Sequence, residues 1–161
     1  MISLAAALIA SAAPAATPAD AFDQLKALQG IWINGEQPES PLRVHFTVTA
    51  GGSTVVEEWR AGERPHSLTI YTLDGDAILA THYCPQGNQP RLASQPGAPL
   101  SFNLRDVTGL DEGESHAANL DIMTDGTTIT RRERYHKGTT PQDWSELKLV
   151  RQPEGEDRPA S

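Results

Sequence analysis

Cysteine is almost absent from this sequence of 161 residues, since it occurs only once, as Cys84. A lone cysteine cannot form a disulfide within the chain, so a hydrophobic core must supply the stability of the fold. Long apolar runs are also missing, because the longest, residues 2–13, falls short of the roughly 20 residues that a spanning helix needs. Basic residues number 13 against 21 acidic ones, and the net charge of −8 disfavours nucleic acid as a partner, because nucleic acid is itself a polyanion.

The two ends of the chain differ from its middle. Residues 1–21 hold the apolar stretch and small residues that fit an Ala-x-Ala cleavage pattern ending at Ala15 or Ala21. This pattern predicts a signal peptide and a periplasmic or secreted protein. The segment lacks lysine and arginine, so an alanine-rich tail on a cytosolic protein or a misassigned start codon is the alternative. Residues 22–151 are expected to form one domain, and the polar, proline-containing residues 152–161 a disordered tail.

The domain is predicted to begin with one helix and to continue entirely in β-strands. In residues 18–29, Phe22, Leu25 and Leu28 recur at helical spacing, Asp20 can cap the start, and Gly30 follows the end. After Gly30 the apolar period becomes two, interrupted by short Gly- and Asp-containing turns. The predicted strands are residues 31–35, 42–49, 54–60, 66–73, 77–84, 90–94, 100–107, 116–123, 127–135 and 144–151.

Short connections favour an all-β, up-and-down antiparallel barrel of about ten strands over a sandwich, which needs long crossovers. The helix would plug one end of the barrel, because its apolar stripe of Phe22, Leu25 and Leu28 must be buried. Ten strands enclose more space than side chains are expected to fill, so the fold predicts a cavity for a small, partly apolar molecule.

The order of several motifs is similar to that of calycin-type, lipocalin-like barrels. These motifs are "LQGIW", "GGSTVVEEW", "THYC", "GNQPR" and "SHAANLDIMTDGTTITRRERY". More narrowly, the chain resembles uncharacterised bacterial DUF1579-like barrels, in the subset that carries the "THYC" and "GNQPR" pattern. The resemblance implies a barrel with a cavity and assigns no chemistry. Nitrobindin-like haem barrels are a neighbouring group with a proximal histidine near the carboxy end, but residues 144–151 contain no histidine, so haem is not expected.

Alternation along the strands suggests which polar side chains face this cavity. His82 and Cys84 share a face with Ile78 and Ala80, and His116 shares one with Leu120 and Ile122, whereas His45 is expected to face solvent. His82, Cys84 and His116 could then supply ligands to zinc or copper, although buried hydrogen-bonded histidines and a buried free thiol explain the same pattern. We predict no cofactor and keep the metal as the alternative.

A second group of candidates lies on the strands that follow Gly52. Glu57 and Trp59 share one face, and a carboxylate beside an indole can act as a general acid, but an ion pair of Glu57 with Arg131 is the simpler interpretation. Tyr71 is predicted to join them in the ligand-binding set.

The last candidate ligand-binding residues lie in and just after the turn that follows Cys84. Asparagine tolerates the positive φ angle of a turn, which explains Asn88. Arg91 could direct its guanidinium across the barrel mouth as a bidentate donor, or it could be a solvated surface residue. The predicted ligand-binding residues are Glu57, Trp59, Tyr71, His82, Cys84, Asn88, Arg91 and His116. The prediction is a ligand-binding barrel, with two alternatives: an enzyme that uses His82 and His116 for acid–base chemistry, or a packed interaction module without a ligand.

Overall fold

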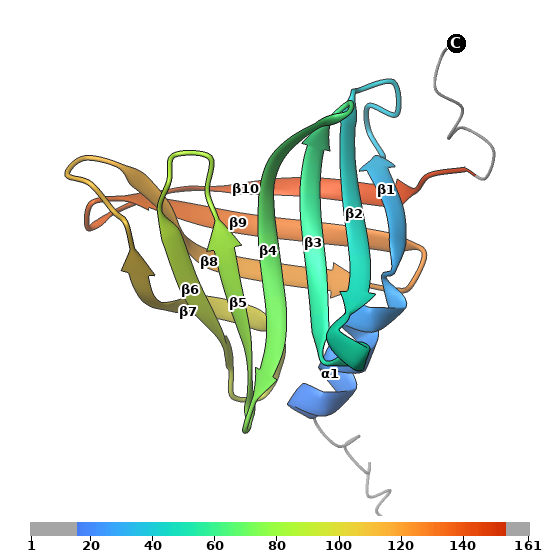
Figure 1. Ribbon diagram of the computed structural model, residues 1–161, viewed down its shortest axis with the longest axis horizontal. Coiled ribbons are helices and arrows are strands. Elements are labelled where there is room, and N and C mark those ends of the chain that lie inside the picture. The colour runs from blue at the N-terminus through green and yellow to red at the C-terminus, as the bar shows by residue number, and fades with distance from the viewer. Residues whose placement is uncertain (1–15, 154–161) are drawn as a thin grey trace, which may run out of the picture.

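The computed structural model describes residues 16–153, which form a closed antiparallel barrel of ten strands with one α-helix at one end (Figure 1). Residues 1–15 of the predicted leader and residues 154–161 of the predicted tail lie outside the described part. In chain order the elements are α1 (Pro18–Ala27), β1 (Gly30–Asn34), β2 (Leu42–Thr49), a 3-10 turn η1 (Ala50–Gly52), β3 (Thr54–Ala61), β4 (Arg64–Asp74), β5 (Ala77–Tyr83), β6 (Gln89–Gln95), β7 (Ala98–Thr108), β8 (Ser115–Thr124), β9 (Thr128–Lys137) and β10 (Thr140–Arg151).

The barrel closes because the first and last strands pair. Each strand is hydrogen-bonded to its sequence neighbour, and β1 pairs with β10 through Trp32 opposite Arg151 and Ile33 opposite Val150. Turns with glycine in the left-handed region join the hairpins, as at Gly75 (φ 59°), where L-residues with a Cβ are disfavoured. The sequence-based prediction of an up-and-down barrel is therefore confirmed, and the sandwich is excluded.

The helix closes one end of the barrel. Phe22, Leu25 and Leu28 are each at most 1% exposed and pack into the core. The helix starts with a capping box in which Thr17, and not Asp20 as predicted, is the N-cap. Asp20 occupies position N3, where its backbone N–H donates to the Thr17 hydroxyl and its carboxylate accepts from the Thr17 backbone N–H. The indole of Trp32 donates a 2.8 Å hydrogen bond to the carbonyl of Leu28, which ties the helix to β1.

The interior changes character from one end to the other. We call the end covered by α1 the helix end, and the opposite end, where β5 connects to β6 and β7 to β8, the loop end (Figure 1). The inner row of β3 runs from buried Val55 to Glu57 and Trp59, and the facing row of β9 from Ile129 to Arg131. The side chains are thus apolar at the helix end and become polar towards the loop end.

Candidate binding site

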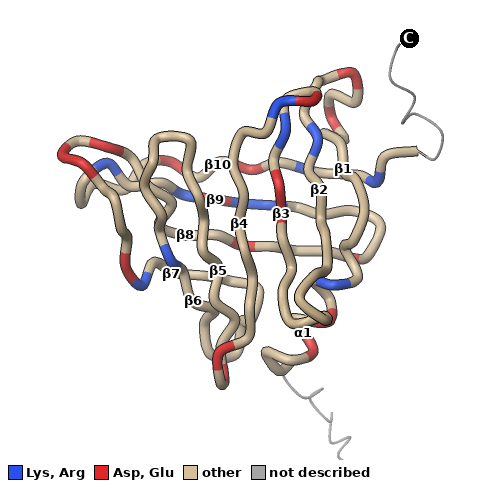
Figure 2. The backbone as a smooth tube through the Cα atoms, in the orientation of Figure 1, with Lys and Arg blue, Asp and Glu red and all other residues tan. Residues whose placement is uncertain are grey.

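An ion pair crosses the interior of the barrel. Arg131 on β9 places its Nε atom 2.8 Å from Oε1 of Glu57 on β3, and the two side chains are 5% and 0% exposed. Figure 2 shows the acidic stretch of β3 and the basic stretch of β9 on opposite walls of the barrel. The expectation that Glu57 pairs with Arg131 is confirmed. Removing two charges from water costs free energy, which the pair offsets only with additional hydrogen bonds.

Those additional contacts come from neighbouring strands. Glu57 Oε1 accepts a 2.8 Å hydrogen bond from Trp59 Nε1, and Oε2 accepts one from the hydroxyl of Tyr71. Burial, followed by the nearby charge of Glu57, raises the pKa of Tyr71 well above its usual value, so Tyr71 remains a protonated donor. Each described contact of Glu57 supplies a donor or a positive charge to its oxygens. The Glu57 carboxylate therefore acts as a hydrogen-bond acceptor for both neighbouring side chains.

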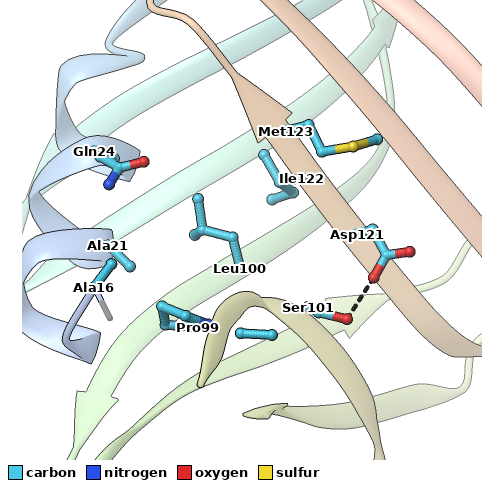
Figure 3. A pocket seen from close by; sticks show the side chains of 10 residues that line it. Ala16, Ala21, Gln24, Pro99, Leu100, Ser101, Asp121, Ile122 and Met123 are labelled. Atoms are coloured by element: carbon cyan, nitrogen blue, oxygen red, sulfur yellow. Dashed lines mark hydrogen bonds between the residues drawn. The ribbon is translucent and has the colours of Figure 1, made fainter. Parts of the chain in front are cut away.

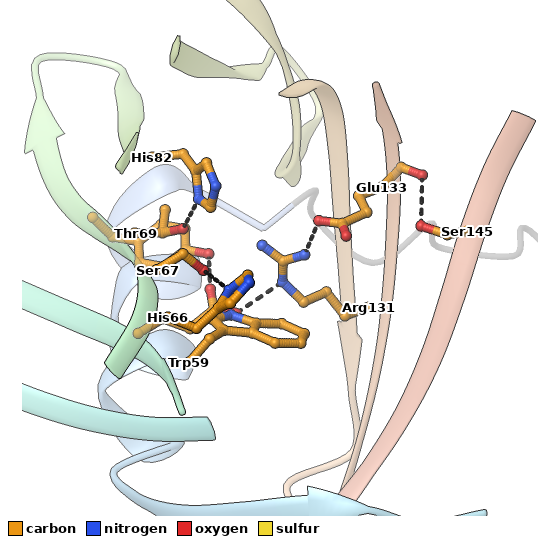
Figure 4. A network of polar contacts seen from close by, with 10 residues as sticks. Trp59, His66, Ser67, Thr69, His82, Arg131, Glu133 and Ser145 are labelled. Carbon is orange, nitrogen blue, oxygen red and sulfur yellow. Dashed lines mark hydrogen bonds and ion pairs between the residues drawn. The ribbon is translucent and has the colours of Figure 1, made fainter. Parts of the chain in front are cut away.

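The guanidinium of Arg131 has two further contacts. Its Nη1 atom pairs with Oε2 of Glu133, two residues further along β9, and the guanidinium carbon lies 4.9 Å from the centre of the Trp59 ring (Figure 4). A cation over an indole face is stabilised by the quadrupole of the ring. Arg131 is therefore held between two carboxylates and one aromatic surface, with its orientation fixed from three directions.

His82 on β5 approaches this cluster from another wall. Its Nδ1 atom lies 3.0 Å from the hydroxyl of Thr69, and the side chain is 5% exposed. Burial and, to a smaller extent, the positive charge of Arg131 lower the pKa of His82 to about 4, so the imidazole is neutral at pH 7. Its other nitrogen, Nε2, is buried and has no hydrogen-bond partner among residues 16–153.

This unpartnered nitrogen belongs to a lining residue of a small cavity. The cavity measures about 10 Å³, which is close to the space that one water molecule requires. Its lining residues are Thr69, His82, Leu92, Ala117, Asn119, Leu120, Arg131 and Glu133. Bulky buried side chains such as Trp32, Tyr71 and Phe102 occupy much of the barrel interior. The expected cavity for a small, partly apolar molecule stays a prediction.

His116 does not join His82. A β-bulge between Ala117 and Asn119 shifts the alternation of β8, so that His116 lies opposite His136 and not in the row of Leu120 and Ile122. The two imidazole rings are 6.0 Å apart in an edge-to-face arrangement, and burial together with His136 lowers the pKa of His116. The placement of His116 in the interior row was therefore wrong, because strict alternation does not anticipate a bulge.

The remaining predicted residues lie around the loop end. Cys84 is a free, half-buried thiol, and within the described part of the chain no three His, Cys, Asp or Glu side chains are arranged to hold a metal ion. Asn88 is fully buried and donates to the carbonyl of Ser115 at 3.1 Å and to Oε2 of Glu114 at 3.2 Å. Asn88 thereby fastens the β5–β6 connection to the start of β8.

Arg91 has a role at the surface. It forms a bidentate pair with Asp106 on β7, with distances of 2.6 and 2.7 Å, and its side chain is 53% exposed. The structure thus agrees with the alternative of a surface arginine, since Arg91 alternates with the buried Pro90 and Leu92 along β6. It does not reach across the mouth.

Thr69 and Glu133 were missed as site residues. Both belong to the interior rows of their strands, and the available signal was the presence of Arg131 and Glu133 two and four residues after buried Ile129. Charged residues in an apolar row indicate a buried polar cluster or a site. His45, expected to face solvent, is half-buried.

A second, shallower pocket of about 310 Å³ lies at the helix end, beside the N-terminal half of α1 and the start of β7 (Figure 3). Its lining is mainly apolar, with Leu100, Ile122 and Met123 prominent. Its polar pair is satisfied internally, because the hydroxyl of Ser101 donates to Asp121 at 2.5 Å. In the region that the structure describes, none of the buried polar atoms without a partner belongs to a residue that lines this pocket, in contrast to the interior cavity with His82 Nε2.

Compared with known proteins, the chain matches no family model and no curated protein. The closed ten-strand barrel is compatible with a calycin-like fold, and the narrower resemblance to DUF1579-like proteins stays a prediction. Within residues 16–153, no helix is both long and apolar enough to cross a membrane.

Proposed function

We propose that this protein is a small-molecule-binding barrel whose site lies inside the loop end, at His82, Arg131 and Glu133. The observation that carries this proposal is the unpartnered Nε2 atom of His82 in a cavity that it shares with Arg131. An unsatisfied buried polar atom costs about 1–3 kcal/mol, and a ligand that bonds to it recovers this free energy.

The buried charges support the same conclusion. Replacing a buried ion pair by apolar residues of similar volume is often neutral or stabilising, so stability alone does not require Glu57 and Arg131 inside a barrel. Recognition of a polar ligand does require such groups, because a preformed hydrogen-bonding surface avoids the cost of ordering side chains during binding.

The size of the cavity determines how a ligand enters. A water-sized space admits a small polar head group, while the rest of the molecule stays towards the loop end. The Glu133 side chain is 26% exposed, so solvent reaches the site from that side. Leu92 and Leu120 supply apolar contacts beside the head group. This arrangement suits a small, partly apolar molecule with one polar end.

Binding fits the geometry better than acid–base catalysis. His82 contacts Thr69, whereas His116 packs against His136 beyond a bulge in another strand. The two histidines therefore belong to separate clusters and do not present two nitrogens to one substrate.

We also propose that the protein is exported, with cleavage after Ala15. Cleavage there would leave the Thr17–Asp20 capping box intact, while cleavage after Ala21 would remove the cap and a fully buried alanine. Export agrees with the resemblance to lipocalin-like barrels, which act as carriers.

A cavity-filling variant tests the binding proposal. Wild-type protein and Ala117→Val are titrated with a panel of small amines, alcohols, carboxylates and aromatic compounds, and the melting temperature is recorded. At least one class is expected to raise the melting temperature of the wild type but not that of Ala117→Val, because the valine methyl groups occupy the cavity. Ala93→Val, on the outer row of β6, is the matched control. A flat response of the wild type to the whole panel would overturn the proposal.

A further inference from the structure

The charges around the cavity do not balance. One guanidinium, that of Arg131, faces the carboxylates of both Glu57 and Glu133. His82 adds no charge at pH 7, because burial and Arg131 lower its pKa to about 4, and Tyr71 remains protonated. With both carboxylates ionised, these five side chains carry one more negative than positive charge.

Two other cations flank Glu133 on β9, but they have contacts towards the surface. Arg132 lies 3.5 Å from Glu146, and the guanidinium carbons of Arg132 and Arg134 lie 4.9 and 5.1 Å from the ring centre of the exposed Trp144. Arg134 also donates a 2.9 Å hydrogen bond to Oδ1 of Asn119, an uncharged residue that lines the cavity on β8.

The other walls of the cavity carry no charge. Thr69 and Ser67 on β4, Leu92 on β6, and Ala117 and Leu120 on β8 are uncharged. Burial raises the pKa of Tyr135, the next interior residue of β9 after Glu133, which keeps it neutral.

Two further ionisable side chains, His66 and Lys137, are exposed. His66 is exposed and contacts the hydroxyl of Ser67 at 3.3 Å (Figure 4). Lys137 is exposed at the far end of β9, six residues from Arg131 and hence about 20 Å away by strand rise. That separation exceeds the Debye length of about 8–10 Å, so Lys137 is screened from the site.

Besides the donors of Arg131, the cavity is lined by two side chains that can accept hydrogen bonds, Glu133 and His82. Arg131 contacts Glu133 through the Oε2 atom of the carboxylate. When the hydroxyl of Thr69 accepts from Nδ1–H of His82, the Nε2 atom is a bare acceptor. Glu133 and His82 both line the water-sized space.

We propose that the cavity binds the primary ammonium group of a small aliphatic amine, with the Glu133 carboxylate and His82 Nε2 as its acceptors. This inference rests on the proposed function and specifies its ligand class. An ammonium group is about as large as a water molecule and has three N–H donors, so it fits both the volume and the acceptors. A carboxylate would meet the excess negative charge, and a trimethylammonium group exceeds the available space.

Four probes that share a butyl chain separate these possibilities: n-butylamine, 1-butanol, pentanoate and butyltrimethylammonium. Each is titrated into the full chain at pH 7, and dissociation constants are measured by NMR, together with the ¹⁵N shifts of the His82 ring. The amine is expected to bind about tenfold more tightly than the alcohol and to shift the Nε2 resonance, because charge-assisted hydrogen bonds are about twice as strong as neutral ones. Pentanoate and butyltrimethylammonium are expected to leave the Nε2 resonance unchanged.

Two isosteric variants test whether the Glu133 carboxylate causes the preference for the amine over the alcohol. Glu133→Gln removes the excess negative charge and is expected to bring the amine and the alcohol to similar affinities. Glu58→Gln is the matched control, because Glu58 lies on the same strand as Glu57 but in the opposite row, paired with Arg60 at 2.9 Å. In the control, the preference for the amine is expected to persist, and circular dichroism confirms that each variant is folded.

The outcomes distinguish the two proposals. If pentanoate or butanol binds at His82 more tightly than the amine, or if Glu133→Gln retains the tenfold preference, the ammonium assignment is overturned while the binding site stands. If neither these probes nor the wider panel binds, both proposals are overturned.

Discussion

The guanidinium of Arg131 on β9 and the carboxylate of Glu57 on β3 meet 2.8 Å apart inside the barrel, with neither side chain more than 5% exposed. Between these strands, the barrel order passes through β10, β1 and β2, so the pair joins two separate parts of the wall. Since Trp59, Tyr71 and Glu133 complete the contacts of the pair, a change at either member should be transmitted to the others.

Loss of one partner should be far more harmful than loss of both. Arg131→Met leaves Glu57 buried without its cation and is expected to lower the free energy of unfolding by about 3–5 kcal/mol. The double variant Arg131→Met/Glu57→Leu should lose less than the sum of the single losses, because no charge remains buried and unpaired. Urea unfolding of the four proteins in this cycle provides the measurement, and simple additivity would contradict direct coupling.

Tyr71 should contribute to the stability of the fold through its hydroxyl group. Tyr71→Phe keeps the ring against Phe102 but removes the hydrogen bond to Glu57, which is expected to cost about 1.5–3 kcal/mol because the acceptor is charged. The same change at Tyr83, which is 44% exposed, should have little effect and is the control. Thermal unfolding compares the two variants, and equal losses would argue against a special role for the Tyr71 hydroxyl.

The free energy of unfolding should decrease as the pH is lowered from 6.5 to 4. The pKa of His82 is about 4 in the folded protein against 6.5 for a free histidine, so the unfolded state binds more protons between these values. The contribution of neutral His82 is therefore fully present above pH 6.5 and is lost as the pH falls towards 4, a change of about 3 kcal/mol. Unfolding at a series of pH values measures the slope.

A histidine variant tests whether His82 causes this pH dependence of stability. His82→Gln is expected to make stability less dependent on pH between 6.5 and 4, without abolishing the dependence, because the pKa of His116 is also lowered. His66→Gln, at an exposed position, should retain the slope of the wild type. An unchanged slope in His82→Gln would show that other groups control this range.

The mature amino terminus should be Ala16 when the full sequence is expressed with export. Intact mass and amino-terminal sequencing of the exported protein measure it directly. A start at Phe22 would remove the Thr17–Asp20 cap, which contributes about 0.5–2 kcal/mol in helices, and would contradict this prediction. Protein that retains residues 1–15 would contradict export itself.

Much of the fold could be predicted from local sequence because each feature depends on near neighbours. The period of two identified the strands, and Gly75 marked a turn that needs a left-handed backbone. The pairing of Glu57 with Arg131 was also predictable, since a charge in an apolar row needs a partner in the interior. Glu133 was missed although it shares the row of Arg131, because the alternating charges around it resemble a solvated face.

The sequence by itself determined the strands, their order and the polar character of one end of the interior, because alternation and turn chemistry are local properties. Only the tertiary structure decided that His116 turns away from His82, since the bulge next to it arises from the pairing of β8 with β9. It also decided that the interior holds a water-sized cavity, because the remaining volume depends on how side chains from all ten strands and the helix pack together.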